Sequence, residues 1–295
     1  MTGGARGIGR AVALALAERG HAVCVNDTGV ALDGSRPHPG PADEVAAEIR
    51  AAGGEALAVA TDARTRPGAE AVVAAAEAWV GAAPSVLVHS AGTLRDAMVH
   101  KATDEDWAEV LGSHLSVALE LTRAVAGSMR SEGYGRIVYI GGAAGLVGSV
   151  GQAAYAVAKA GLFGLTRAVA LEMAGRDVGV NYVAPFAFTR MTESIPPVTD
   201  RLREYLRAAP AARPEDVAPL VAWLCSSEAG TSGQVFGARG AEVTLWSQPR
   251  PVVEVVDRTG WTVEALTESR SRLDPHLVPL ESEFDLFGGP PVPVR

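Results

Sequence analysis

The 295-residue chain is 48% apolar, which is enough to bury the core of one large α/β domain or two small ones. Its formal net charge of -8 offers no basic surface to phosphate backbones or anionic lipids, which argues against nucleic acid and membrane partners. No stretch approaches the roughly 20 apolar residues of a membrane helix. Cys24 and Cys225 lie far apart in apolar runs, so we expect buried thiols, no metal and a cytoplasmic location.

The N-terminus allows a second interpretation, because Arg6 and Arg10 precede an apolar run like that of a secretory signal. That run covers only residues 11–17 and then meets Glu18 and Arg19. A glycine pattern explains the same residues better than a signal does.

Short β-rich runs alternate with longer helical stretches beyond this point. The expected strands cover residues 21–26, 55–61, 85–89, 136–140, 179–183 and 234–238. Helices are expected over 10–19, from near Asp43 to Gly53, from a capping box at Thr103, and over 214–225. The pattern predicts an α/β fold, a Rossmann-type doubly wound parallel sheet with helices on both faces.

The composition changes at Ser247, after which prolines recur and the one long helical pattern covers 262–272. We therefore divide the chain into a domain over residues 1–246 and a proline-rich C-terminal extension over 247–295. We expect the extension to wrap on the body or on a neighbouring subunit. Disorder of the last ten residues is an equal alternative.

Glycines are concentrated in Thr2-Gly3-Gly4-Ala5-Arg6-Gly7-Ile8-Gly9, immediately before an expected helix. Backbone amides at such a helix N-terminus can approach a pyrophosphate without side chains in the way. Asp27 ends the next expected strand, where a carboxylate accepts hydrogen bonds from a ribose 2'-hydroxyl and repels a 2'-phosphate. These residues favour NAD over NADP. The alternatives are an ordinary tight turn and a solvated turn aspartate.

Tyr155 and Lys159 share one face of an expected helix because they lie four residues apart. A nearby ammonium favours the phenolate and lowers the tyrosine pKa from its unperturbed value near 10. Tyr155 can then act as a general acid or base around neutrality. A surface Tyr and Lys pair on a helix is the alternative.

Together these motifs resemble the short-chain dehydrogenase/reductase family along most of the chain. Further matching elements are Asp62, Ser90-Ala91-Gly92 and the segment from Asn181 to Pro185. The sequence is most similar to the branch that contains the 3-hydroxyacyl-CoA dehydrogenase domain of peroxisomal multifunctional enzyme type 2 and its bacterial relatives. That similarity rests on strings such as Val25-Asn26-Asp27, Gly151-Gln152-Ala153-Ala154-Tyr155 and Arg190-Met191-Thr192.

The resemblance implies that Tyr155 exchanges a proton with the substrate oxygen while hydride passes between the carbinol carbon and the nicotinamide. Lys159 and His114 would complete the catalytic group. The implied cofactor-binding residues are Thr2, Gly3, Arg6, Gly7, Ile8, Gly9, Asp27, Asp62, Ala91, Gly92, Tyr155, Lys159, Pro185 and Phe188. Family members commonly associate through the helices preceding and containing Tyr155, which implies a homo-dimer or homo-tetramer.

The largest departure from the family pattern is at the catalytic serine, because Gly142 stands thirteen residues before Tyr155. Losing one such hydrogen-bond donor costs about 3 to 4 kcal/mol, or about 100- to 1000-fold in rate. Ser149 is the only nearby hydroxyl before Tyr155, and either a rescue role or a polar loop position fits it.

Histidine replaces asparagine at two family positions. His114 stands at the tetrad asparagine, where the resembled branch also uses histidine, and either ring nitrogen can support a proton-relay water. His89 and Ser90 stand where the family usually has two asparagines, and we interpret His89 as a packed strand-end residue.

The first strand of this fold precedes the glycine segment, yet Met1 directly precedes Thr2. We expect the sheet to lack that central strand and to leave two inner edges unpaired. One hypothesis is a coding start assigned too late, and another is a truncated product with impaired cofactor binding. The first fails if the upstream codons do not encode a short apolar strand.

We expect an oxidoreductase for a secondary alcohol or ketone with a bulky apolar substrate, a 3-hydroxyacyl thioester or a steroid-like ring. Apolar residues after residue 183 could form a flap over the site or simply pack on the body: Phe186, Phe188, Met191, Ile195, Leu202, Tyr205 and Leu206. A catalytically weak, cofactor-binding partner subunit is the alternative function, because of Gly142. An NAD-sensing regulator has no support, since no helix-turn-helix pattern or basic patch is present.

Overall fold

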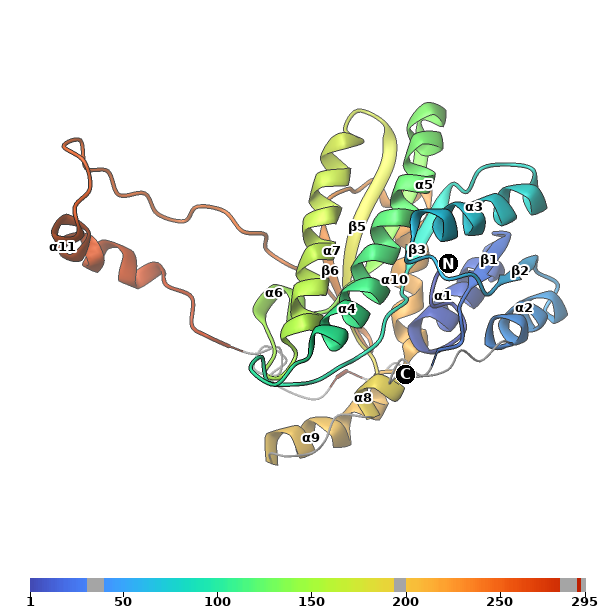
Figure 1. The fold of residues 1–295 in the computed structure, drawn as a ribbon, viewed down its shortest axis with the longest axis horizontal. Coiled ribbons are helices and arrows are strands. Elements are labelled where there is room, and N and C mark those ends of the chain that lie inside the picture. Colours follow the sequence, from blue (N-terminus) through green and yellow to red (C-terminus); the bar gives the residue numbers. More distant parts are fainter. Residues whose placement is uncertain (31–39, 194–199, 282–290, 293–295) are drawn as a thin grey trace.

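Buried β-rich runs and helices alternate along the chain and assemble into a sheet with helices on both faces (Figure 1). The computed structural model describes residues 1–30, 40–193, 200–281 and 291–292. The strands are β1 (Val23–Asn26), β2 (Ala56–Val59), β3 (Val86–His89), β4 (Tyr134–Ile140), β5 (Asp177–Phe186), β6 (Val235–Arg239) and β7 (Glu242–Leu245). The helices are α1 (Gly7–Glu18), α2 (Pro41–Ala51), α3 (Arg66–Val80), α4 (Asp104–Leu111), α5 (Val117–Glu132), α6 (Ala144–Val147), α7 (Ala153–Glu172), α8 (Arg190–Glu193), α9 (Asp200–Ala208), α10 (Pro214–Leu224) and α11 (Val263–Leu273).

The strands β3, β4, β5 and β6 are parallel neighbours in that order, and β1 pairs in parallel with β2. One core cluster packs α1, α2 and α10 against the sheet, and a second packs α3, α5 and α7. The α/β fold and all six expected strands are confirmed. One further strand that the sequence did not predict, β7, pairs antiparallel to β6 through a tight hairpin at one edge of the sheet.

The N-terminal residues bridge two strands that do not pair with each other. The Thr2 amide donates to the Val88 carbonyl at 3.0 Å, and Met1 accepts from the Asn26 amide at 2.8 Å. Among the described residues, only this bridge lies between β1 and β3, as the sequence predicts. A cavity of about 350 Å³ occupies the space beside it, lined by apolar side chains of both strands and of α3 and α5. Burial there lowers the pKa of the Met1 ammonium.

Parallel strands place their carboxyl ends at one edge of a sheet, and that edge collects the predicted site residues. Asp27 follows β1, Ser90 follows β3 and Gly141 follows β4. β5 is longer than expected and carries Pro185 within its last residues. The capping box that opens α4 is confirmed, since Thr103 and Asp106 bond each other's backbone amides.

α7 is the one helix in the described ranges that is long and apolar enough to cross a membrane, at a mean hydropathy of 1.2. Core helices of soluble proteins can be equally long and apolar. Its inner face contributes Leu162 and Val169 to a core cluster, and it also carries the buried Lys159. These contacts describe a core helix of the body.

Candidate active site

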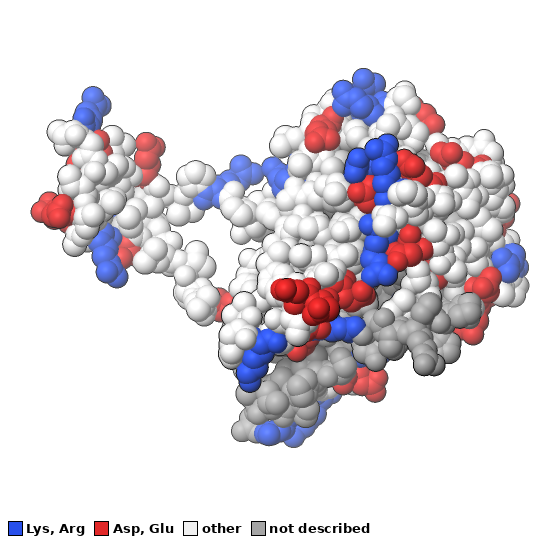
Figure 2. Space-filling model, viewed as in Figure 1, with Lys and Arg blue, Asp and Glu red and all other residues white. Residues whose placement is uncertain are grey.

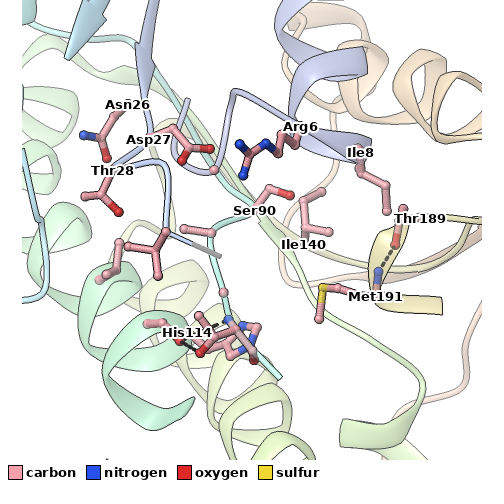
Figure 3. Close-up of a pocket in the computed structure, with 18 of the residues that line it drawn as sticks. Arg6, Ile8, Asn26, Asp27, Thr28, Ser90, His114, Ile140, Thr189 and Met191 are labelled. Atoms are coloured by element: carbon pink, nitrogen blue, oxygen red, sulfur yellow. Dashed lines mark hydrogen bonds between the residues drawn. The ribbon is translucent and has the colours of Figure 1, made fainter. Parts of the chain in front are cut away.

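A pocket of about 520 Å³ opens at the carboxyl edge of the sheet (Figure 3). Arg6 and Asp27 face each other in one part of it, and His114 lies in another part, on the far side of Ser90. The pocket lining includes most of the predicted site residues: Gly3, Arg6, Gly7, Ile8, Asp27, Asp62, Ala91, Gly92, His114, Tyr155, Lys159 and Pro185. The fold therefore brings together segments that lie far apart in the sequence.

The glycine segment forms a tight turn that leads into α1. Gly3 has a φ of +62°, and a Cβ there would lie 2.6 Å from the backbone nitrogen of Ala91, so no other residue fits. α1 begins at Gly7, and no side chain caps its first amides. Gly7 and Ile8 line the pocket, so these amides present a cradle of partial positive charge to an anionic ligand.

Asp27 is held by the backbone on two sides. Its carboxylate accepts from the Ala5 amide at 3.1 Å and from the Gly29 amide at 2.8 Å. These bonds fix the orientation of the carboxylate at the pocket wall, which a freely solvated turn aspartate would not have. The guanidinium of Arg190 lies near both Arg6 and Asp27, and burial followed by repulsion from Arg6 lowers its pKa.

Asp62 lies on the wall opposite α1 and is paired with a cation. Its carboxylate accepts from the Arg64 Nε at 2.8 Å and from the Arg64 backbone amide at 2.9 Å. Burial raises the pKa of Asp62, but the hydrogen bonds and charge of Arg64 together outweigh it and lower the pKa. Asp62 therefore lines the pocket as an anion whose orientation Arg64 fixes.

Tyr155 and Lys159 lie one turn apart on α7 and both line the pocket. The Lys159 ammonium lies 5.3 Å from the centre of the Tyr155 ring and donates to the Ile140 carbonyl at 2.8 Å. Lys159 is only 3% exposed, and burial lowers its pKa from 10.5 to about 7. The pair is thus a phenol with a buried amine that titrates near neutrality, and the alternative of a surface pair is excluded.

His114 reaches the pocket from a π turn, Gly112–Ser116, between α4 and α5. π turns are rare and frequently occur at functional sites. The Nε2 atom donates to the Thr93 carbonyl at 2.9 Å, so Nδ1 is an acceptor, and it has no hydrogen-bond partner among the described residues. The ring packs edge-on against Tyr155 at 5.3 Å between centroids. Burial and then the charge of Lys159 hold the pKa of His114 well below 6.5, so the ring is neutral.

Gly142 faces Tyr155 at the position where the family's serine is expected. A Cβ at residue 142 would lie 3.1 Å from the Tyr155 hydroxyl. The hydroxyl of Tyr182 holds the backbone from behind, since it accepts from the Gly142 amide at 2.9 Å and donates to the Gly142 carbonyl at 2.7 Å. Ser149 is not among the residues that line the pocket, so the structure gives it no rescue role.

Three predicted cofactor-binding residues do not line the pocket. Thr2 is buried and bonds the Nδ1 atom of His89 at 2.9 Å, which confirms His89 as a packed strand-end residue. Gly9 lies behind the loop, where a Cβ would overlap the Gly3 carbonyl. Phe188 packs instead with Phe186, Ala209 and Ala212 in a separate apolar cluster.

Two of the apolar residues that could form a flap or pack on the body are found to pack on the body. Phe186 and Phe188 face the cluster and not the pocket, whereas Met191 lines the pocket. Ile195 and the side chains of Leu202 and Tyr205 lie outside the described residues.

Sequence analysis missed several residues that line the pocket: Thr28, Thr93, Ser113, Thr189, Arg190 and Thr192. Arg190 stands within a string that indicates the family branch, but that string gives no sign that Arg190 lines the same pocket as Asp27. The Ser113 hydroxyl bonds the Thr93 hydroxyl at 2.9 Å, a contact that joins two segments twenty residues apart. Only the folded chain shows it.

Comparison with known protein families identifies the family of this chain. The model of short chain dehydrogenases matches residues 1–199. The chain belongs to the short-chain dehydrogenase family. Hydroxyacyl-CoA dehydrogenase ChsB1 of Mycobacterium tuberculosis is 38% identical over 285 residues, which cover 90% of this chain and 85% of that enzyme.

Of two further relatives, the first supports the predicted branch and the second supports the family and its fold. Peroxisomal multifunctional enzyme type 2 of Mus musculus is 39% identical over 236 residues, which cover 80% of this chain and 30% of that enzyme. A crystal structure of a short chain dehydrogenase from Mycobacterium avium is similar with a TM-score of 0.79 and 36% identity, and it covers 99% of this chain and 96% of that chain. The resemblance to the multifunctional enzyme and bacterial hydroxyacyl-CoA dehydrogenases is confirmed, and this short-chain dehydrogenase is an oxidoreductase.

Proposed function

We propose that this short-chain dehydrogenase interconverts a secondary alcohol and a ketone with NAD as the hydride carrier. The observation that carries the proposal is the convergence of Tyr155, Lys159 and His114 on the same pocket that holds the glycine turn. A phenol beside a titrating amine suits proton exchange, and open helix amides suit a diphosphate.

The residues present fit a nicotinamide dinucleotide. The turn at Gly3 brings backbone within van der Waals reach of Ala91, so the cradle at α1 stays free of side chains. Asp27 would hold the adenosine ribose, and Asp62 would lie against the adenine side. A fixed carboxylate at Asp27 disfavours a 2'-phosphate, while Arg6 and Arg190 nearby reduce that penalty. We infer a preference for NAD that depends on Asp27.

NAD would accept or supply the hydride, and the chain supplies the proton. Tyr155 accepts the hydroxyl proton of the alcohol in oxidation and returns a proton to the ketone oxygen in reduction. Protonated Lys159 stabilises the phenolate form of Tyr155. Neutral His114 packs edge-on against the tyrosine ring and so helps to fix the orientation of the phenol.

Gly142 leaves the substrate oxygen without the side-chain donor that a serine would provide. We therefore propose that turnover is about 100- to 1000-fold slower than it would be in the same pocket with that hydroxyl.

For the substrate we propose a 3-hydroxyacyl thioester. One relative supports this class by name, the hydroxyacyl-CoA dehydrogenase ChsB1 of Mycobacterium tuberculosis. Val117, Ile140 and Met191 give the pocket apolar wall next to the reacting group, which suits an acyl chain or a steroid-like ring.

Absorbance assays of NADH formation with a panel of 3-hydroxyacyl-CoA and hydroxysteroid substrates test the proposal, with NADP in place of NAD as the cofactor control. We expect turnover with NAD on at least one 3-hydroxyacyl-CoA. Tight NAD binding by calorimetry with no turnover on any substrate would instead favour the second candidate, a cofactor-binding partner subunit of weak activity, which Gly142 specifically supports.

A further inference from the structure

The turn that follows β4 is supported from inside the body and not by the C-terminal extension. Figure 2 shows the segment that carries α11 separated from the body, as does Figure 1. None of residues 249–281 is buried, and none lines the pocket. The expectation that the extension wraps on its own body is therefore wrong for these residues. The support for the turn comes from side chains buried behind it.

Two tyrosines lie side by side in the sheet and differ in where their hydroxyls bond. Tyr139 on β4 and Tyr182 on β5 are register partners, and both are 0% exposed. The Tyr139 hydroxyl bonds the Thr122 hydroxyl on α5 at 2.6 Å. The Tyr182 hydroxyl bonds the backbone of Gly142. One tyrosine therefore ties the sheet to a helix, and the other ties it to the turn beside Tyr155.

The Tyr182 hydroxyl satisfies both backbone polar groups of Gly142. It accepts from the Gly142 amide at 2.9 Å and donates its single proton to the Gly142 carbonyl at 2.7 Å. A buried backbone group that loses its partner is costly. These two bonds therefore fix the position and orientation of residue 142.

The Tyr182 ring also fills the space that a side chain at residue 141 would need. A Cβ on Gly141 would overlap the Cζ atom and both Cε atoms of Tyr182. Gly141 does not have a positive φ, so this overlap and not the backbone conformation requires glycine. The Gly141 amide donates to the Val183 carbonyl at 2.7 Å, so the turn cannot withdraw from the ring without breaking the sheet. Gly141 and Tyr182 are a matched pair.

The turn held in this way contacts both members of the proposed proton-transfer pair. Lys159 donates to the carbonyl of Ile140, one residue before Gly141, at 2.8 Å. A Cβ at Gly142 would lie 3.1 Å from the Tyr155 hydroxyl. A shift of the turn would therefore move the carbonyl that anchors Lys159 and change the space beside Tyr155. A misplacement of about 1 Å near a reacting group can cost about 100-fold in rate.

We propose that Tyr182 is a positioning residue for the proton-transfer pair. Its hydroxyl and its ring hold residues 140–142 in the place where Lys159 and Tyr155 meet them. Tyr182 does not line the pocket, so it acts only through this turn. The inference rests on the proposed dehydrogenase function, because the position of the turn affects a rate only if Tyr155 transfers the proton.

Two phenylalanine variants separate positioning from a structural role. Tyr182→Phe removes the hydroxyl that bonds Gly142, and Tyr139→Phe removes an equally buried hydroxyl that bonds Thr122. Urea unfolding measures stability, and steady-state assays with NAD and a 3-hydroxyacyl-CoA give kcat and KM. We expect both variants to unfold at lower urea concentration. Only Tyr182→Phe should lose about tenfold in kcat, with a KM for NAD within about twofold of the wild type. Unchanged kcat in Tyr182→Phe, or an equal loss in both variants, would overturn the proposal.

Amide hydrogen exchange provides a readout that needs no turnover. The Gly142 amide is bonded to the Tyr182 hydroxyl, whereas the Gly141 amide is bonded to the Val183 carbonyl and serves as an internal reference. In Tyr182→Phe we expect the Gly142 amide to exchange at least about tenfold faster relative to the Gly141 amide. The ratio should be unchanged in Tyr139→Phe. An unchanged ratio in Tyr182→Phe would contradict the anchoring of the turn.

The fit of the ring is tested by a double-mutant cycle on stability. Gly141→Ala places a Cβ in the Tyr182 ring, and Tyr182→Leu removes the atoms that it would overlap. We expect Gly141→Ala to cost less stability in the Tyr182→Leu background than in the wild type. A Gly141→Ala protein that does not fold, beside a double variant that does, is the same result, and additive effects would overturn the role of the ring. Should the wild type turn over no substrate, the proposed function fails, and the exchange ratio and this cycle decide whether Tyr182 holds the turn.

Discussion

The two walls of the pocket differ in how strictly their glycines are required. On the dinucleotide wall, a Cβ at Gly3 would lie 2.6 Å from backbone, and one at Gly92 would overlap the ring of His114. Gly142 lies beside the reaction wall and next to the lining residue Gly141. A Cβ there would lie 3.1 Å from the Tyr155 hydroxyl and at ordinary contact distance, 3.6 and 3.7 Å, from the Tyr155 ring and Lys159 Cγ, and Gly142 does not have a positive φ. The backbone geometry therefore requires glycine at positions 3 and 92, whereas position 142 could accept a small side chain.

The missing hydroxyl is therefore a local change in an otherwise assembled site. Tyr182 holds the Gly142 backbone through two hydrogen bonds, and Lys159 bonds the neighbouring Ile140 carbonyl. The frame that would position a serine is therefore still present. The predictions below test each wall in turn.

The largest effect is expected at Tyr155. Tyr155→Phe removes the proton carrier while keeping the ring that packs on His114. Turnover should fall by about 10²- to 10⁴-fold. NAD affinity measured by calorimetry should change less than about threefold, since the substitution leaves the glycine turn intact. Equal turnover by the two proteins would show that another group moves the proton.

Lys159 should control how stability depends on pH. Burial lowers its folded pKa to about 7, while the unfolded chain keeps its ordinary value near 10.5. Between these values the unfolded state binds more protons, so the free energy of unfolding should rise with pH by up to about 1.4 kcal/mol per unit. Lys159→Met lacks this group, so its free energy of unfolding, measured by urea denaturation, should depend less on pH between pH 7 and 10. Parallel pH profiles would contradict a buried, titrating Lys159.

Asp27 should set the choice between the two nicotinamide cofactors. Asp27→Asn removes the charge that repels a 2'-phosphate, while Arg6 and Arg190 remain. We expect NAD affinity to fall about tenfold and NADP affinity to rise, by calorimetry. The matched control is Asp62→Asn, which makes the same chemical change next to Arg64 and should leave the ratio of the two affinities unchanged.

The smallest effect on the site is expected at Phe188. Its side chain packs with Phe186, Ala209 and Ala212, so Phe188→Ala should lower the free energy of unfolding by about 1 to 3 kcal/mol. NAD affinity should stay within about twofold, because the residue does not line the pocket. A tenfold loss of NAD affinity at unchanged stability would place Phe188 on the cofactor wall after all.

Residue patterns were sufficient to predict the parts of the fold that local burial determines. The strand that ends at Asn26 is a short apolar run, and all its residues except Cys24 are buried, so its place follows from composition. β7 was missed because its outward side chains, Val243 and Leu245, lie at an open edge and not in a core. An exposed strand of this kind gives no alternation of buried and solvated positions.

The site was predictable where a motif fixes the backbone and not where packing orients a side chain. Tyr155 and Lys159 share a helix face by spacing alone. Phe188 turns toward Ala212 because that cluster covers it, and Arg190 lines the same pocket as Asp27 because the chain after β5 returns to the glycine turn. Contacts between distant segments of this kind depend on the whole topology.

The role of the missing hydroxyl is tested most directly by a substitution that restores it next to Tyr155. Turnover of a 3-hydroxyacyl-CoA with NAD is compared for the wild type, Gly142→Ser and Gly142→Ala, where alanine adds the Cβ without the hydroxyl. We expect Gly142→Ser to turn over about 100-fold faster than Gly142→Ala, with no gain from alanine over the wild type. Equal rates for serine and alanine would contradict the claim that this pocket lacks only one donor.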